Sequence, residues 1–189
     1  MRENQLFERL LHVIEYDIVP KTRAEAAAGS KIFGAAVLRK DDLSLVLAET
    51  NHEAYSPLWH GEVYTIKMFY EKQGHLDASD CIFLSTHQPC CMCASALAWA
   101  GFREIYYLFG YDNTEADFNI PHDRRMIREL FGCNEPAPEN YYFKWRSIPD
   151  MAKTMPDAKA AGERIERIKK TYAELSEIYQ SGEKRMVLQ

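Results

Sequence analysis

The sequence predicts an α/β fold in which helices cover a mixed β-sheet. Two short apolar runs, residues 31–40 and 43–51, are joined by Asp41-Asp42, which is typical of an antiparallel hairpin. Further along, the β-rich run 81–86, the alanine-rich run 91–101 and the β-rich run 104–110 indicate strand, helix and strand. This alternation favours two parallel strands joined by a helical crossover. Antiparallel and parallel pairs are therefore expected in one sheet.

The helices of the first half follow from apolar spacing. A first amphipathic helix is expected over residues 3–17, because leucine, valine and isoleucine recur there at three and four residues. Pro20 is expected to end it. A second helix is expected from about His60 to Gln73, with Gly74 as its C-cap.

The second half continues with a loop, a helix, a strand and a long helix. We expect a loop over 111–121, a helix over 122–132, a fifth strand within 141–148, and a final helix from about Asp157. The final helix has a narrow apolar seam, which is expected to dock on the domain or on a second subunit.

Length and composition favour one main domain. The chain has 189 residues, of which 47% are hydrophobic, enough for a substantial core. Residues 1–150 are expected to form the functional domain, and residues 151–189 a C-terminal helical extension.

Charge and hydropathy indicate which classes of partner and which cellular location to expect. The formal net charge of −5 argues against a nucleic acid as the main partner. Charged residues interrupt the first apolar positions and no apolar run is long enough to span a bilayer, so we expect no membrane contact and a cytoplasmic location.

Three of the five cysteines, Cys90, Cys91 and Cys93, stand at the start of a predicted helix, directly after Pro89. An odd number of cysteines in a chain with no export signal disfavours a disulfide framework. Cys90 and Cys93 are three residues apart, so both thiols lie on one side of the helix start. That spacing suits a redox pair or two ligands of one tetrahedral metal.

A third metal ligand is available at the start of the preceding helix. His60 and Glu62 stand at the strand-to-helix edge, where open α/β folds build their sites. One imidazole and two thiolates leave one position of a zinc ion free for water, which zinc acidifies so that it acts as hydroxide near neutral pH. A carboxylate beside that water, here Glu62, can act as general acid and base.

The two motifs His60-Gly61-Glu62 and Pro89-Cys90-x-x-Cys93 resemble the H-x-E and P-C-x-x-C signature of the zinc-dependent cytidine deaminase-like superfamily. The resemblance is strongest to the branch of guanine, cytosine and tRNA-adenosine deaminases. It covers roughly residues 5–150, including the run 32–38, Asn51 and the segment 97–118.

The resemblance implies a three-layer α/β/α sandwich with a central five-stranded mixed sheet, and hydrolytic loss of an exocyclic amino group as ammonia. Zinc hydroxide would attack the ring carbon of a nucleobase, nucleoside or related amino-heterocycle, and Glu62 would move the proton. One Zn²⁺ per chain, held by His60, Cys90 and Cys93, and a homodimer are implied. Asn51, Phe33 and Asn119 are the implied substrate contacts.

The sequence also departs from that branch. Gln88 replaces the usual glutamate before the proline, and Asn119-Ile120 stand where the guanine type has two aspartates. The resemblance therefore does not specify guanine. Two other functions stay open: a tRNA or other nucleic-acid deaminase, and an inactive zinc-binding member of the family.

The remaining cysteines and one tryptophan are expected to pack in the interior. No ligand position is left for Cys81, Cys91 or Cys133, and Trp99 is expected in the core.

Overall fold

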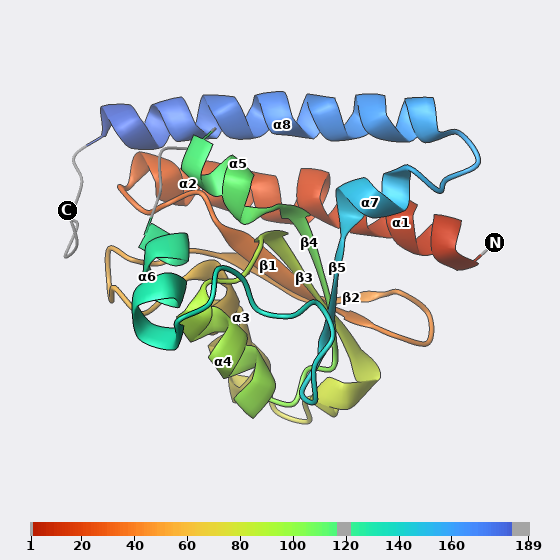
Figure 1. The fold of residues 1–189 in the computed structure, drawn as a ribbon, viewed down its shortest axis with the longest axis horizontal. Coiled ribbons are helices and arrows are strands. Elements are labelled where there is room, and N and C mark those ends of the chain that lie inside the picture. Colours follow the sequence, from red (N-terminus) through yellow and green to blue (C-terminus); the bar gives the residue numbers. More distant parts are fainter. Residues whose placement is uncertain (1, 117–121, 183–189) are drawn as a thin grey trace.

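A five-stranded mixed sheet forms the centre of the computed structural model, which describes residues 2–116 and 122–182 (Figure 1). The strand order is β2-β1-β3-β4-β5. β1 pairs antiparallel with β2 and β3, whereas β3, β4 and β5 run parallel. The strands are β1 (Gly34–Arg39), β2 (Leu45–Thr50), β3 (Cys81–His87), β4 (Glu104–Phe109) and β5 (Lys144–Ser147).

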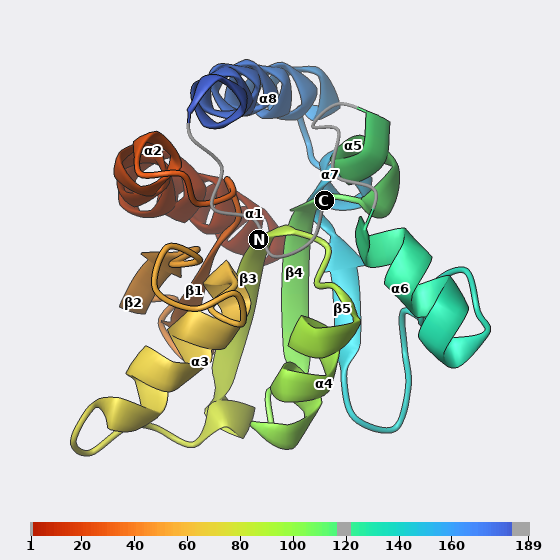
Figure 2. The same ribbon diagram turned by 90° about the vertical axis from the view of Figure 1, so that its left-hand side faces the viewer.

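Helices cover both faces of the sheet, so the predicted three-layer α/β/α sandwich is confirmed (Figure 2). One face carries α3 (Gly61–Glu71) and α4 (Cys91–Trp99), which follow β2 and β3. The other face carries α1 (Arg2–Val13), α2 (Val19–Ala27), α7 (Ile148–Ala152) and α8 (Ala158–Ser181). Two shorter helices, α5 (Tyr111–Ala116) and α6 (His122–Phe131), follow β4, and a 3₁₀ turn (Ala78–Asp80) precedes β3.

The alternation of side chains along the strands divides the core in two. Ala36 and Leu38 of β1 face the layer of α1, α2 and α8, while Ala35 and Val37 face the layer of α3 and α4. β3 is buried along its whole length, as expected of a strand covered on both faces.

The first helical segment is longer than predicted, and Pro20 does not end it. α1 passes through a π-helical segment, Ile14–Ile18, directly into α2. Pro20 lies in the first turn of α2, where the absence of a backbone N–H removes no helical hydrogen bond. In the π segment each backbone hydrogen bond spans one residue more than in an α-helix, and this change of pattern accommodates Pro20 where α2 begins.

Two further helices were not predicted. α5 occupies the first part of the expected loop 111–121, and α7 follows β5 with the Ser147 hydroxyl capping it by accepting from Asp150 N–H.

The final helix lies along the layer of α1 and α2, with Ile165, Ile168 and Leu175 of its seam in the same hydrophobic cluster as those helices. Tyr172 of α8 also packs on His87 and Phe109, the last residues of β3 and β4. The boundary at residue 150 stays a prediction. Within the described ranges, neither α8 nor any other helix is both long and apolar enough to cross a membrane.

Candidate metal centre

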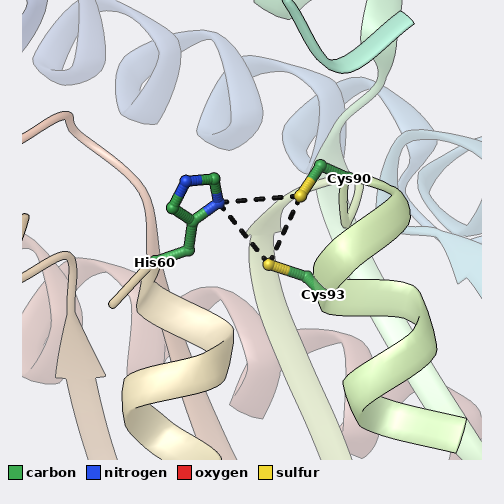
Figure 3. Close-up of side chains that lie close together, drawn as sticks. All are labelled: His60, Cys90 and Cys93. Carbon is green, nitrogen blue, oxygen red and sulfur yellow. Dashed lines mark hydrogen bonds between the residues drawn. The ribbon is translucent and has the colours of Figure 1, made fainter. Parts of the chain in front are cut away.

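Two helices begin side by side at the carboxyl edge of the sheet and bring the motif residues together. His60 is the N-cap residue of α3, and Cys90 is the N-cap residue of α4, with Cys93 one turn further on. Both cap residues have extended backbone, which turns the chain from a strand or loop into the helix. The imidazole and the two thiols therefore converge from neighbouring helices (Figure 3).

The three groups form a nearly equilateral triangle. His60 Nδ1 lies 3.6 Å from Cys90 Sγ and 3.6 Å from Cys93 Sγ, and the two sulfurs are also 3.6 Å apart. A disulfide needs sulfurs at about 2.05 Å, so Cys90 and Cys93 are free thiols here. Tetrahedral zinc, with Zn–S near 2.3 Å and Zn–N near 2.0 Å, would place its ligand atoms about 3.5 to 3.8 Å apart. The triangle has the dimensions of a zinc site.

The three groups of the triangle shift one another's pKa values. The Cys93 thiol and the His60 ring lower the pKa of Cys90 well below its usual value, despite its burial. Burial opposes a charge on His60, but the hydrogen bond to Cys90 and its charge raise the imidazole pKa to about 9. Burial raises the pKa of the Cys93 thiol. A metal ion that binds here displaces protons from these groups.

Glycine at position 61 is required by the close approach of α3 to the sheet. A Cβ atom on Gly61 would lie 2.8 Å from the carbonyl oxygen of Phe33 and 2.9 Å from the Cα of Gly34, at the start of β1. Any larger residue would push the helix start, and with it His60 and Glu62, away from β1.

Glu62 lies beside the triangle and is almost fully buried, with 3% of its surface exposed. Its Oε2 accepts from the Cys93 thiol at 3.3 Å, and its Oε1 accepts from the Ser85 hydroxyl at 2.9 Å. Burial, together with the charge of Cys90, raises the pKa of Glu62 above its usual value. A carboxyl group with a raised pKa is suited to take up and release a proton near neutral pH.

Comparison with known proteins identifies the family. Residues 15–109, half of the chain, match the family of the cytidine and deoxycytidylate deaminase zinc-binding region. This chain belongs to that family. Among curated proteins it is 29% identical to the guanine deaminase of Bacillus subtilis over 120 residues, which cover 62% of this chain and 68% of that protein. The chain is therefore a hydrolytic deaminase of a zinc-binding family, and its cofactor is Zn²⁺.

Solved structures of other deaminases share the fold. The guanine deaminase from Nitrosomonas europaea superposes with a TM-score of 0.50 and 21% identity, over 81% of each chain. A tRNA:A34 deaminase that edits the wobble position of transfer RNA gives 0.51 and 21% identity, over 72% of this chain and 96% of that one. At such identities the likeness concerns the fold of the deaminase and carries no conclusion about its substrate.

The residues present fit the zinc ion of the family. Two thiolates and one imidazole form a donor set that zinc prefers, and three protein ligands leave a coordination position for water. Within residues 2–116 and 122–182, His60, Cys90 and Cys93 are the residues whose donor atoms are grouped closely enough for one ion. These three residues are the proposed ligands of the deaminase.

Asn51 is placed as predicted at the end of β2, but its side chain is held by the protein. Its Oδ1 accepts from the N–H of Gly61 in a short hydrogen bond, and its Nδ2 donates to Glu53 Oε2 at 3.0 Å. The side chain is fully buried. In the deaminase it therefore fastens the loop 51–60 to the start of α3, and a role in substrate binding stays a prediction.

The other two predicted substrate contacts have different outcomes. Phe33 is buried, with 4% of its surface exposed, and its ring packs on His87 at a centroid distance of 4.3 Å. Burial lowers the pKa of His87 to about 3, so this imidazole is neutral. Contact of Phe33 with a substrate stays a prediction. Asn119 lies outside the described residues.

Besides Ser85, three residues around the site were not predicted from the sequence: Glu53, Lys31 and Asp123. Glu53 Oε1 lies 3.6 Å from His60 Nε2 and 2.7 Å from Lys31 Nζ, on the side of the imidazole that faces away from the thiols. Asp123, in the first turn of α6, is buried with 8% exposed. Burial and the nearby charge of Cys90 raise the pKa of Asp123 to about 7. No sequence signal marks these residues, because the loop and the helix that carry them belong to neither motif.

Two packing predictions are wrong. Cys133 is exposed, and Trp99 at the end of α4 is 93% exposed. Cys81 and Cys91 are buried as predicted, Cys91 against Tyr111 and Ile127. Trp99 is exposed because α4 covers the sheet with its other face, through Cys93, Ala94 and Leu97.

Proposed function

We propose that this deaminase replaces an exocyclic amino group on the ring of a nucleobase, nucleoside or related amino-heterocycle with an oxygen from water, releasing ammonia. The position of Glu62 carries the proposal. Its carboxyl group lies 3.3 Å from Cys93 Sγ and is buried, as are Cys90 and Cys93. Holding zinc requires the imidazole and thiolates alone, so a buried carboxyl group at this place has a use in chemistry on water.

The protein's own residues divide the work of the reaction. Zinc held by His60, Cys90 and Cys93 supplies a Lewis acid that makes water nucleophilic near neutral pH. Glu62 takes one proton from the attacking water and gives it to the departing nitrogen. The carbon–oxygen bond forms, the carbon–nitrogen bond breaks, and the nitrogen leaves as ammonia. Ser85 holds Oε1 of Glu62 and thereby keeps Oε2 directed to the reacting groups.

A small substrate fits the surroundings better than a polynucleotide. The net charge is −5, three carboxyl groups (Glu53, Glu62 and Asp123) lie around the site, and the nearby Lys31 is paired with Glu53. An acidic chain of this kind does not favour binding of a phosphate backbone. The 29% identity with a guanine deaminase also supports a free base. Asn51, Phe33 and Asn119 are the proposed contacts of the ring.

Ammonia release tests this proposal directly. Zinc-loaded protein is incubated with cytosine, guanine, adenine, their nucleosides and amino-triazines, and ammonia and the oxygenated product are both measured. We expect at least one of these compounds to be turned over, with activity lost after chelation and restored by zinc. Activity confined to tRNA, with tight and salt-sensitive tRNA binding, would instead support the nucleic-acid function.

We further propose that the deaminase is a homodimer joined through the outer faces of α4 and α6. Trp99 at the end of α4, Phe131 at the end of α6 and Tyr142 in the loop before β5 are exposed and border an apolar hollow of about 540 Å³. Exposed apolar patches of this kind mark interaction sites. Sedimentation velocity is expected to give a dimer for the native chain and a monomer for Trp99→Glu. A monomeric native chain would contradict the proposal.

We propose a cytoplasmic location, because Cys90 and Cys93 must stay reduced to hold the metal and a reducing compartment keeps them so. Cell fractionation followed by immunoblotting tests this. Recovery outside the cytoplasmic fraction would contradict it.

A further inference from the structure

His60 presents its two ring nitrogens to two different partners. Nδ1 faces the thiols of Cys90 and Cys93, at 3.6 Å from each (Figure 3). Nε2 faces the opposite way and lies 3.6 Å from Oε1 of Glu53, in the loop between β2 and α3. Both side chains are well shielded from water, with 15% and 14% of their surfaces exposed. The carboxylate therefore acts on the ring at short range and with little screening.

Three donors hold the Glu53 carboxylate in this position. Lys31 donates twice, from Nζ to Oε1 at 2.7 Å and from its backbone N–H to Oε2 at 3.0 Å. Asn51 donates from Nδ2 to Oε2 at 3.0 Å. Each carboxylate oxygen is thus fixed by at least one hydrogen bond, and the Lys31 ammonium, itself only 16% exposed, balances the charge. A carboxylate this firmly held is a rigid part of the site.

An imidazole can bind a metal only through a nitrogen that carries no proton, so its remaining proton must be on the other nitrogen. A carboxylate facing Nε2 attracts the proton to Nε2 and leaves the lone pair of Nδ1 free toward the thiols. Carboxylates in this place also fix the orientation of the ring and increase its strength as a ligand.

We propose that Glu53, held by Lys31 and Asn51, is the positioning residue of His60 and sets the affinity of the deaminase for zinc. The inference rests on the proposed function, because it takes His60 as a ligand. It adds a set of residues outside both motifs, in which Asn51 acts through Glu53 rather than on the substrate alone.

The chain contains a matched control for this contact. Glu25 Oε1 lies 3.6 Å from His52 Nδ1, the same separation as between Glu53 and His60, with both side chains partly buried. His52 is not one of the residues grouped around the metal position. Loss of the Glu25 carboxylate thus removes a carboxylate at the same distance from an imidazole without acting on the proposed ligand.

The test compares zinc affinity, measured by competition with a chromophoric chelator, and the visible spectrum of the cobalt-substituted protein. Glu53→Ala is expected to bind zinc about 10- to 100-fold more weakly than the native chain and to shift the cobalt bands. Glu53→Gln is expected to give an intermediate zinc affinity, because its amide oxygen keeps a partial negative charge facing Nε2 without the full charge of the carboxylate. Glu25→Ala is expected to match the native chain in both measurements. Circular dichroism of each variant establishes that it is folded.

Zinc affinity of Glu53→Ala within about twofold of the native value, with native cobalt bands, would overturn the inference, as would an equal loss in Glu25→Ala. If Glu53→Ala does not fold, Glu53→Gln decides alone: a loss of about threefold or more supports the inference, and native affinity overturns it. His60→Ala separates the two levels of the account. Native zinc affinity in His60→Ala would mean that the proposed ligand set is wrong. Loss of zinc in His60→Ala, with native affinity in both Glu53 variants, would mean that only the positioning role of Glu53 is wrong.

Discussion

The Ser85 hydroxyl lies between the Glu62 carboxylate and the carbonyl oxygen of His87, 2.9 Å from Glu62 Oε1 and 2.5 Å from the carbonyl. A hydroxyl has one hydrogen, so it can donate to only one of these acceptors at a time. It can donate to Glu62 when that carboxylate is ionised. When Glu62 is protonated, the hydroxyl can donate to His87 and accept from Glu62. Ser85 thus accommodates both states of the proposed proton carrier.

Ser85→Ala is therefore expected to impair turnover without loss of zinc. The hydroxyl lowers the pKa of Glu62 by donating to its ionised form. Without it the pKa rises, and the acidic limb of the kcat/KM profile moves to higher pH. We expect kcat to fall about tenfold, a loss at the low end for an impaired general acid and base. Ser79→Ala, at an exposed position of the 3₁₀ turn before β3, is the control. An unchanged pH profile in Ser85→Ala would contradict the arrangement.

Gly61→Ala is expected to disturb the site through packing. The added Cβ would meet Phe33 O at 2.8 Å, so α3 must shift, at a cost of about 1 to 3 kcal/mol in the free energy of unfolding. Zinc affinity is expected to fall because His60 moves with the helix. Gly162 in α8 has open space around its Cβ position, so Gly162→Ala is expected to stabilise by about 0.5 to 1 kcal/mol. Urea denaturation measures the free energy of unfolding of both variants. Equal changes in Gly61→Ala and Gly162→Ala would contradict the close approach of α3 to β1.

Asp123 gives a pH dependence of stability. Its pKa is raised by burial to about 7, above its value of about 3.8 in an unfolded chain, so the folded state retains the proton over this range. Stability from this group is fully present below about pH 4 and is lost as the pH rises toward 7. The Asp123→Asn variant carries a neutral amide at every pH, so it does not lose this stability as the pH rises. Urea denaturation of zinc-free protein is expected to show the variant gaining on the native chain by at least about 1 kcal/mol between pH 4 and 7. A difference independent of pH would contradict the burial argument.

The strands, the crossover and the two motif helices could be predicted because each depends on local patterns. Apolar runs predict β1 and β3. The spacing of the two motifs predicts a metal site at His60, Cys90 and Cys93. Pro20 misled the prediction because a π-helical segment places it in a first turn, and no simple periodicity reveals such a segment.

The surroundings of the metal site could not be predicted in the same way. Lys31 and Glu53 are 22 residues apart and meet only because β1 and β2 pair as a hairpin that brings their flanking loops together. Asp123 reaches the site through α6, whose position depends on the packing of Ile127 against Cys91 and Tyr111. Contacts of this kind arise from tertiary structure, and a single sequence carries no local mark of them.

The most direct test of the account measures zinc content and ammonia release on the same preparations of the native chain, Glu62→Ala and Cys90→Ala, with the best substrate found. Glu62→Ala is expected to keep one zinc ion per chain and to lose at least about 100-fold in turnover, because it lacks only the proton carrier. Cys90→Ala is expected to lose both zinc and activity. Native turnover by zinc-loaded Glu62→Ala, or full zinc occupancy in Cys90→Ala, would contradict the account.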